Sequence, residues 1–213
     1  MDLFKTSVEN FLAELASDAP TPGGGSVAGL CGAMGAALAS MVANLTIGKE
    51  KYAAAEARMK EAVIEATRMR GEYLSLAARD MEVFSSFMTA LRMPKDTPEL
   101  QAARTEALDV ARREATNVPL EMVELSVALA ELASGVLANG NSNAASDAVA
   151  AVQLAKAAAV VASYNVSINL AGMKGERDAP FVADVRQRTA AAMARIDGFA
   201  AAADARMKEL FGA

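Results

Sequence analysis

The sequence has no histidine, no tryptophan and a single cysteine, Cys31. Without histidine, the usual zinc sites lack their ligands and imidazole-based catalytic triads are excluded, so we expect no metal site and no cofactor. Acid–base chemistry must therefore use Asp, Glu, Lys, Tyr or Cys side chains. Because one cysteine cannot form an internal disulfide, and because no charged and then apolar signal sequence opens the chain, we expect a cytoplasmic protein.

Aromatic residues are also scarce, at 5% of the chain, whereas hydrophobic residues make up 53% and include many Ala, Met and Leu. This composition is typical of a helical core with few rings, and it predicts an all-α protein. The 213 residues are enough to bury a substantial core. Their number fits one domain that spans residues 1–213.

The chain also lacks a block of basic residues. Its formal net charge is −5, and acidic and basic side chains are interspersed along the sequence. A protein that binds nucleic acid or an anionic membrane surface carries a basic patch, so we expect neither of these partners.

The segment from Val27 to Ile47 has no charged side chain and is rich in Gly, Ala and Ser. It is long enough to cross a bilayer, but it contains Ser40, Asn44 and Thr46, and no comparably apolar segment follows. A buried central helix is therefore the favoured interpretation. Small residues one helical turn apart would let neighbouring helices approach closely; they are Gly25, Gly29, Ala33 and Ala37.

A glycine-rich turn, Pro22–Ser26, stands directly before this helix. Such a turn leaves backbone N–H groups free at a helix start, where the partial positive charge favours an anion or a polar ligand edge. No Gly-Lys-Ser/Thr follows and no strand precedes, so the turn is not a nucleotide loop of a known pattern. A plain helix start is the alternative. The candidate binding residues are Pro22, Gly23, Gly24, Gly25 and Ser26.

Apolar residues at helical spacing and the positions of Pro and Gly predict the other helices. The Glu50–Arg92 segment would form a rod of roughly 60 Å, so either Gly71 marks a kink or the rod packs along a second subunit. We expect a helical bundle in which the central small-residue helix is surrounded by longer helices. The predicted ranges are Asp2–Ala16, Glu50–Arg92, Pro98–Leu137 with an interruption at Pro119, Ala144–Ala171, and Ala179–Leu210.

One carboxylate lies on an otherwise apolar helix face. The residues at alternating steps of three and four are Tyr73, Leu76, Asp80, Phe84, Phe87 and Leu91. Burying an unpaired carboxylate costs several kcal/mol, so Asp80 must be paired, protonated or facing a ligand cavity. Burial would raise its pKa toward the range that a general acid or base needs. The alternative is an Asp80 that pairs with an Arg or caps a neighbouring helix.

A second polar turn, Asn139–Asn143, opens the next apolar helix, and Asp147 stands in its first turn. If the two polar turns meet, they form one cavity lined by amides, and Asn141 and Asp147 become candidate binding residues. Asp147 could instead stabilise the positive start of its own helix. Lys49, at the far end of the central helix, could neutralise the negative helix end or bind a carboxylate.

Several of these segments, in order along nearly the whole chain, resemble the cyclodeaminase/cyclohydrolase family of tetrahydrofolate enzymes. That family includes the cyclodeaminase half of formiminotransferase-cyclodeaminase and stand-alone bacterial methenyltetrahydrofolate cyclohydrolases. The matching residues are Ala19–Ser26, Met41–Thr46 with Gly48 and Lys49, Asp80 with Phe84, Leu91–Lys95, Asn117–Pro119, Asn141–Asp147 and Asn165–Leu170.

The resemblance implies a helical bundle that forms a homodimer and binds a folate, with Asp80 as the catalytic residue. It implies hydrolysis of 5,10-methenyltetrahydrofolate to 10-formyltetrahydrofolate, with cyclodeaminase chemistry on formiminotetrahydrofolate as the close alternative. The glycine-rich turn, Asn141 and Asp147 would then hold the pterin edge or the tetrahedral oxygen, and Lys49 would meet the glutamate tail. A non-catalytic folate-binding or scaffold protein is the alternative of another class.

Overall fold

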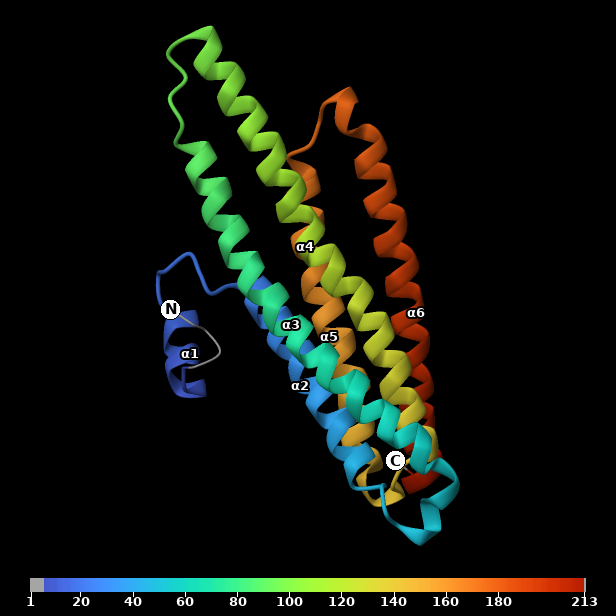
Figure 1. Ribbon diagram of the computed structural model, residues 1–213. Coiled ribbons are helices and arrows are strands. Elements are labelled where there is room, and N and C mark those ends of the chain that lie inside the picture. Colours follow the sequence, from blue (N-terminus) through green and yellow to red (C-terminus); the bar gives the residue numbers. More distant parts are fainter. Residues whose placement is uncertain (1–5, 213) are drawn as a thin grey trace.

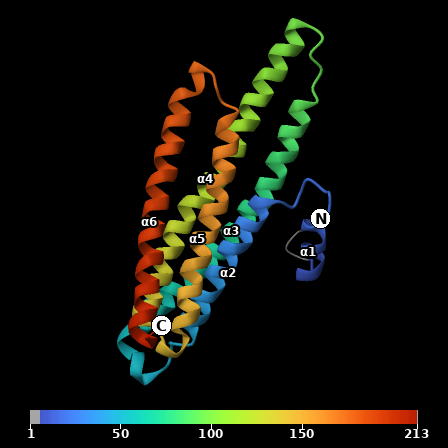
Figure 2. The same cartoon turned by 180° about the vertical axis from the view of Figure 1, so that it is seen from behind.

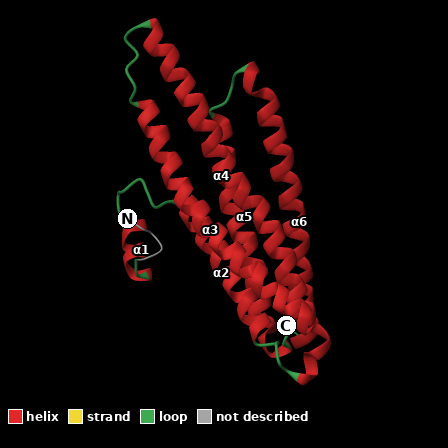
Figure 3. Ribbon diagram, viewed as in Figure 1, coloured by secondary structure: helices red, strands yellow, loops and turns green. Residues whose placement is uncertain are grey.

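The computed structural model describes residues 6–212, which form helices and no strand (Figures 1 and 3). The predicted all-α class is confirmed. The first helix, predicted from Asp2, begins only at Val8 after its N-cap Ser7, while residues 2–5 of the predicted range lie outside the described residues. The helices are α1 (Val8–Leu15), α2 (Gly24–Asn44), α3 (Glu56–Leu91), α4 (Pro98–Asn139), α5 (Ala145–Ala171) and α6 (Ala179–Phe211), joined in part by short 3-10 turns at Glu50–Ala55, Ser142–Ala144 and Glu176–Asp178.

Helices α2 to α6 alternate in direction along one bundle. Helix α2 packs against α3, α4 and α5, and α6 covers α4 and α5 on the other side (Figures 1 and 2). The short helix α1 stands beside this bundle (Figure 1). Helices α2 and α5 run in opposite directions, so the start of each lies beside the end of the other. The two polar turns, which precede these helices, therefore lie at opposite ends of the bundle.

Small residues in α2 let α3 approach closely. A Cβ atom added at Gly29 would lie 2.6 Å from the Cβ of Ala77, and one at Gly32 would lie 2.2 Å from the ring of Tyr73. Tyr73 is fully buried, and its hydroxyl donates a hydrogen bond of 2.9 Å to Ser126 on α4. Any side chain larger than hydrogen at Gly29 or Gly32 would push α3 away, so these two glycines determine the distance between α2 and α3.

The outward face of α2 carries an apolar stripe at steps of four and three. We call it the outer stripe; it consists of Val27, Cys31, Met34, Leu38, Met41 and Leu45. Met34 is 51% exposed and Leu45 is 44% exposed, while the glycine-rich inner face is buried. Helix α2 thus packs against three longer helices, and its fourth face is left open over most of its length. In the described part of the chain, α1 lies near this face, across a groove that includes Phe11, Val27 and Leu74 of α3.

The predicted interruption at Pro119 is wrong, because α4 runs unbroken through this residue. Proline has no N–H, so it leaves the carbonyl of Ala115, four residues earlier, without its helical donor. The side-chain amide of Asn169 on α5 donates to that carbonyl at 2.5 Å. A neighbouring helix therefore supplies the missing hydrogen bond. Helix α3 likewise passes through Gly71 without interruption.

The expectation that no comparably apolar segment follows the central helix is wrong, because α2 and Ser142–Ala171 are both long and apolar enough to cross a membrane by length and composition alone. In the bundle, 56% of the α2 window and 50% of the other window are buried against neighbouring helices. Core helices of this composition pass the same test, and the close packing of α2 on α3 is the packing of a core helix.

Candidate active site

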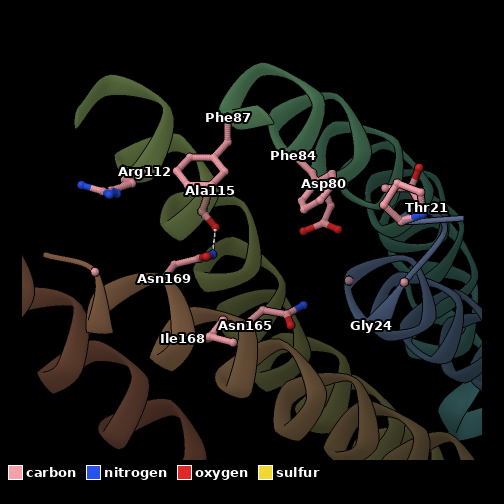
Figure 4. Close-up of a pocket in the computed structure, with 14 residues that line it drawn as sticks. Thr21, Gly24, Asp80, Phe84, Phe87, Arg112, Ala115, Asn165, Ile168 and Asn169 are labelled. Carbon is pink, nitrogen blue, oxygen red and sulfur yellow. Dashed lines mark hydrogen bonds between the residues drawn. The ribbon is translucent and has the colours of Figure 1, made fainter. Parts of the chain in front are cut away.

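A cavity of about 490 Å³ lies where α2 begins (Figure 4). Helix α2 starts at Gly24 beside Asp80 of α3, whereas α3 continues for roughly three further turns, about 16 Å. Helices α4 and α5 also pass this level, so the missing turns of α2 leave a space between them. The lining residues are Pro20, Thr21, Gly23, Gly24, Gly25, Asp80, Phe84, Phe87, Arg112, Ala115, Asn165, Ile168, Asn169 and Gly172.

The first turn of α2 forms the base of this cavity. Gly23 precedes the helix in an extended conformation and no side chain caps it. The first N–H groups of a helix have no partner within the helix, and here they belong to Gly24, Gly25 and Ser26. The helix start therefore offers free amides and a partial positive charge to a ligand in the cavity.

Asp80 lies directly over this turn, with its carboxylate directed toward the start of α2 (Figure 4). A Cβ atom added at Gly25 would lie 2.1 Å from the Oδ2 atom of Asp80, so only glycine leaves room for the carboxylate. Among residues 6–212, the carboxylate of Asp80 has no hydrogen-bond or ion-pair partner, and burial raises its pKa. Asp80 is thus a half-buried carboxylate that faces a cavity without a neutralising partner.

The wall that α3 gives to the cavity is aromatic, and the wall that α5 gives carries two amides and an isoleucine. Phe84 and Phe87 come from α3, one turn apart, and Ile168 comes from α5. Asn165 and Asn169 come from the last turns of α5 (Figure 4). The amide of Asn169 is already used on the Ala115 carbonyl, whereas Asn165 makes no hydrogen bond within the described residues and faces Gly24. A flat ligand with a polar edge fits these walls.

Arg112 lies at the opposite end of the cavity from Asp80 (Figure 4). Its guanidinium carbon lies 5.9 Å from the centre of the Phe87 ring, and no acidic side chain pairs with it in residues 6–212. We did not predict this residue from the sequence, where it stands next to Arg113. Phe84 and Phe87 stood on the predicted face of Asp80 without a role of their own, and their helical phase relative to Asp80 was the available signal. Asn165 and Asn169 stood in the segment Asn165–Leu170, for which the family resemblance was the available signal.

The expectation that the two polar turns meet is wrong within the single chain. Asn141 is tied to the far end of α2, about 30 Å from the start of this 21-residue helix. Its N–H donates to Thr46 at 2.8 Å and its amide to the Leu45 carbonyl at 3.2 Å. Lys49 and Asp147 lie at the same far end, because α5 begins where α2 ends. None of the three lines the cavity.

Two residues of the glycine-rich turn also do not line the cavity. Pro22 and Ser26 are both buried, and the Oγ atom of Ser26 has no hydrogen-bond partner in the described part of the chain. From this turn the structure places Gly23, Gly24 and Gly25 against the cavity. In residues 6–212 no group of three or more His, Cys, Asp or Glu side chains is arranged to hold a metal ion.

Comparisons with known proteins agree in family and fold. A model of the formiminotransferase-cyclodeaminase family matches residues 7–191. The methenyltetrahydrofolate cyclohydrolase of Methylorubrum extorquens is 44% identical over 167 residues, which are 78% of this chain and 80% of that protein. The formimidoyltransferase-cyclodeaminase of Sus scrofa is 34% identical over 87% of this chain but only 34% of its own length, so this chain spans about a third of it. The crystal structure of formiminotetrahydrofolate cyclodeaminase from Thermotoga maritima aligns with a TM-score of 0.84 and 30% identity, covering 99% of this chain and 98% of that chain.

Proposed function

Because the chain belongs to the formiminotransferase-cyclodeaminase family, we propose that it hydrolyses 5,10-methenyltetrahydrofolate to 10-formyltetrahydrofolate. The observation that carries this proposal is the unpaired, half-buried carboxylate of Asp80 above the free amides of α2. The relative from Methylorubrum extorquens is a methenyltetrahydrofolate cyclohydrolase, which supports the choice of reaction.

The charge of the substrate suits this end of the cavity. The methenyl bridge between N5 and N10 is a cationic amidinium, and a carboxylate without a partner attracts it. The bridging carbon is already electrophilic, so catalysis chiefly needs an oriented water and a group that moves protons. Because a bound cation favours the charged form of a nearby carboxylate, the substrate itself would lower the pKa that burial raises in Asp80.

In the proposed reaction, Asp80 takes a proton from water as the water oxygen bonds to the methenyl carbon, which gives a neutral carbinol. The bond between that carbon and N5 then breaks, and the proton on Asp80 passes to N5. The hydroxyl proton of the carbinol leaves to solvent as the formyl carbonyl forms, so each turnover releases one proton. The amides of Gly24 and Gly25 would stabilise the oxygen in the tetrahedral state, and Asn165 would hold the edge of the pterin.

The first test replaces Asp80 by Asn, which keeps the shape of the side chain and removes its basicity. We expect Asp80→Asn to fold and to lose turnover of the methenyl substrate by roughly a hundredfold or more, measured as loss of the methenyl chromophore. Asp147→Asn is the matched control, since Asp147 is also half-buried and lies at the other end of α2. Full turnover in Asp80→Asn would exclude the acid–base role.

Cyclodeaminase chemistry is the second candidate, favoured by the similarity of the whole chain to the Thermotoga maritima structure. In that reaction N10 attacks the formimino carbon and ammonia leaves, while Asp80 would move the proton. Both substrates should be assayed side by side: loss of the methenyl chromophore supports the hydrolase and ammonia release supports the deaminase. If neither reaction occurs, a folate-binding or scaffold protein remains.

We also propose that two copies of the chain associate through the outer stripe of α2. Its steps of four and three are those of a helix that packs along a partner helix, and large exposed apolar side chains on one face mark an interaction surface. The family resemblance, in which the bundle is dimeric, supports this assignment.

We propose the cytoplasm as the location, which fits a protein whose one cysteine, Cys31, is free.

A further inference from the structure

The cavity has opposite charges at its two ends. The carboxylate of Asp80 lies over the start of α2, and the guanidinium of Arg112 lies at the other end, beyond Phe84 and Phe87 (Figure 4). Of the described residues that line the cavity, Arg112 is the only cationic one. The apolar rings between the two charges leave each charge free to select a separate part of one elongated ligand.

Arg112 lacks an internal partner, which distinguishes it from its neighbour in the sequence. The guanidinium of Arg113 binds Asp178 at 2.5 Å and lies 4.8 Å from the ring of Phe181. That of Arg112 lies over the ring of Phe87, 5.9 Å from its centre, and has no acidic partner within residues 6–212. A half-buried guanidinium above an aromatic ring presents a planar set of donors that matches a carboxylate.

We propose that Arg112 binds a carboxylate of the glutamate tail of the folate and so fixes the direction in which the substrate enters. This inference rests on the proposed function. The amidinium ring lies toward Asp80, the aminobenzoyl ring lies along Phe84 and Phe87, and the tail ends at Arg112. The order of groups in the substrate, a cation, then a flat ring, then an anion, is the order of complementary groups in the cavity. Arg112 therefore takes the role that the sequence had suggested for Lys49.

The test combines a variant with a truncated substrate. Arg112→Met keeps the apolar stem of the side chain on Phe87 and removes the charge. Kinetics are measured with 5,10-methenyltetrahydrofolate and with 5,10-methenyltetrahydropteroate, which lacks the glutamate. We expect Arg112→Met to raise KM for the first substrate about tenfold or more with little change in kcat, and to leave KM for the second unchanged. Arg113→Met is the matched control and should leave the ratio of the two KM values as in the wild type.

Equal effects of Arg112→Met on both substrates, or no effect on either, would overturn the proposal. A second measurement does not depend on turnover: the Kd of 5-formyltetrahydrofolate, with its glutamate-free counterpart as control. The variant should weaken only the form that carries the glutamate. If the wild type hydrolyses no methenyl substrate, the proposed reaction fails, while these binding measurements still decide the role of Arg112.

Discussion

At the scale of single residues, the properties of Asp80 follow from what is missing around it. Its carboxylate is half-buried beside Gly25, and no cation or hydrogen-bond donor in residues 6–212 pairs with it. Burial without a partner raises the pKa of a carboxyl, because water stabilises the charged form better than the protein does. Burial of Asp80 without a partner therefore makes its carboxylate more basic, and it also lowers the stability of the folded state when Asp80 is charged.

The pH profile of activity should show this raised pKa. Turnover needs the carboxylate, so kcat/KM should fall as pH drops through the pKa of Asp80 in the free enzyme. That acidic limb should lie above the pKa of about 3.9 of an ordinary Asp. The limb of kcat should lie at lower pH, because the bound cationic substrate favours the charged carboxylate. A limb of kcat/KM at or below the ordinary value would contradict the assignment of Asp80 as the base.

Activity should fall as the pH drops and Asp80 is protonated, whereas the contribution of Asp80 to the stability of the folded state should become more favourable. The folded state binds the Asp80 proton more tightly than the unfolded chain does, so the destabilisation is full above the raised pKa and vanishes as pH falls below the unfolded pKa. Asp80→Asn should therefore unfold at a higher urea concentration than the wild type at neutral pH. The difference between the two proteins should shrink toward zero as pH is lowered. A less stable variant at neutral pH would show that Asp80 has a stabilising partner.

Gly25 offers a test of how tightly the carboxylate is held. Gly25→Ala would place its Cβ 2.1 Å from Oδ2 of Asp80, so α3 or the carboxylate must move. At Gly24 the nearest atom to an added Cβ is Oδ1 of Asn165 at 3.6 Å, an ordinary contact. We expect Gly25→Ala to lose turnover at least tenfold more than Gly24→Ala, measured with the same methenyl assay. Equal losses would mean that the position of Asp80 over Gly25 is unimportant.

At the scale of elements, local signals predicted the start of α4 but not every helix end, since α1 begins at Val8 and α3 at Glu56, both later than predicted. Thr97 accepts a hydrogen bond from the N–H of Leu100 and caps α4, as its position before Pro98 predicts. Pro119 misled the prediction, because the donor that replaces its missing N–H belongs to Asn169, far along the chain. Sequence near a proline shows that a hydrogen bond is lost, but the replacement depends on how helices pack.

This compensation can be measured as a double-mutant cycle. Asn169→Ala should lower the free energy of unfolding by about 1–3 kcal/mol, because the Ala115 carbonyl is left without a donor. In a Pro119→Ala background, residue 119 regains its N–H and can donate to Ala115 itself. The Asn169→Ala substitution should then cost clearly less in urea unfolding. Equal costs in both backgrounds would show that the two residues act independently.

At the scale of the whole molecule, the sequence identified Asp80 on α3 as a candidate catalytic residue. It did not identify the residues of other helices that line the cavity with Asp80. Helical spacing was sufficient to single out Asp80, because three- and four-residue steps define a helix face without tertiary information. Whether Asn141 or Asn165 lies near Asp80 depends on helix direction, since Asn141 stands just before the start of α5 and Asn165 near its end. Arg112 was missed because the sequence does not show which of two adjacent arginines turns inward.

The open face of α2 predicts the state of association. Met34 is 51% exposed at the middle of the outer stripe, and a charge there would be buried on pairing. Met34→Glu should shift the protein to a monomer in sedimentation or light-scattering measurements while its circular dichroism stays helical. Ile64→Glu is the control, since Ile64 is 67% exposed on α3 and outside the stripe. A wild-type chain that is monomeric at high concentration would contradict the proposed pairing.

The start of α2 has a further consequence for the volume that the site can hold. Since the cavity occupies the level at which α2 has no residues, its depth is measured in turns of one helix, each about 5.4 Å. One additional turn at the N-terminus of α2 would fill the cavity with backbone. Removing one turn there would enlarge the cavity and move the free amides of the first turn deeper into the bundle. A change in the length of α2 alone would thus change the size of ligand that the cavity holds, without any change in α3, α4, α5 or α6.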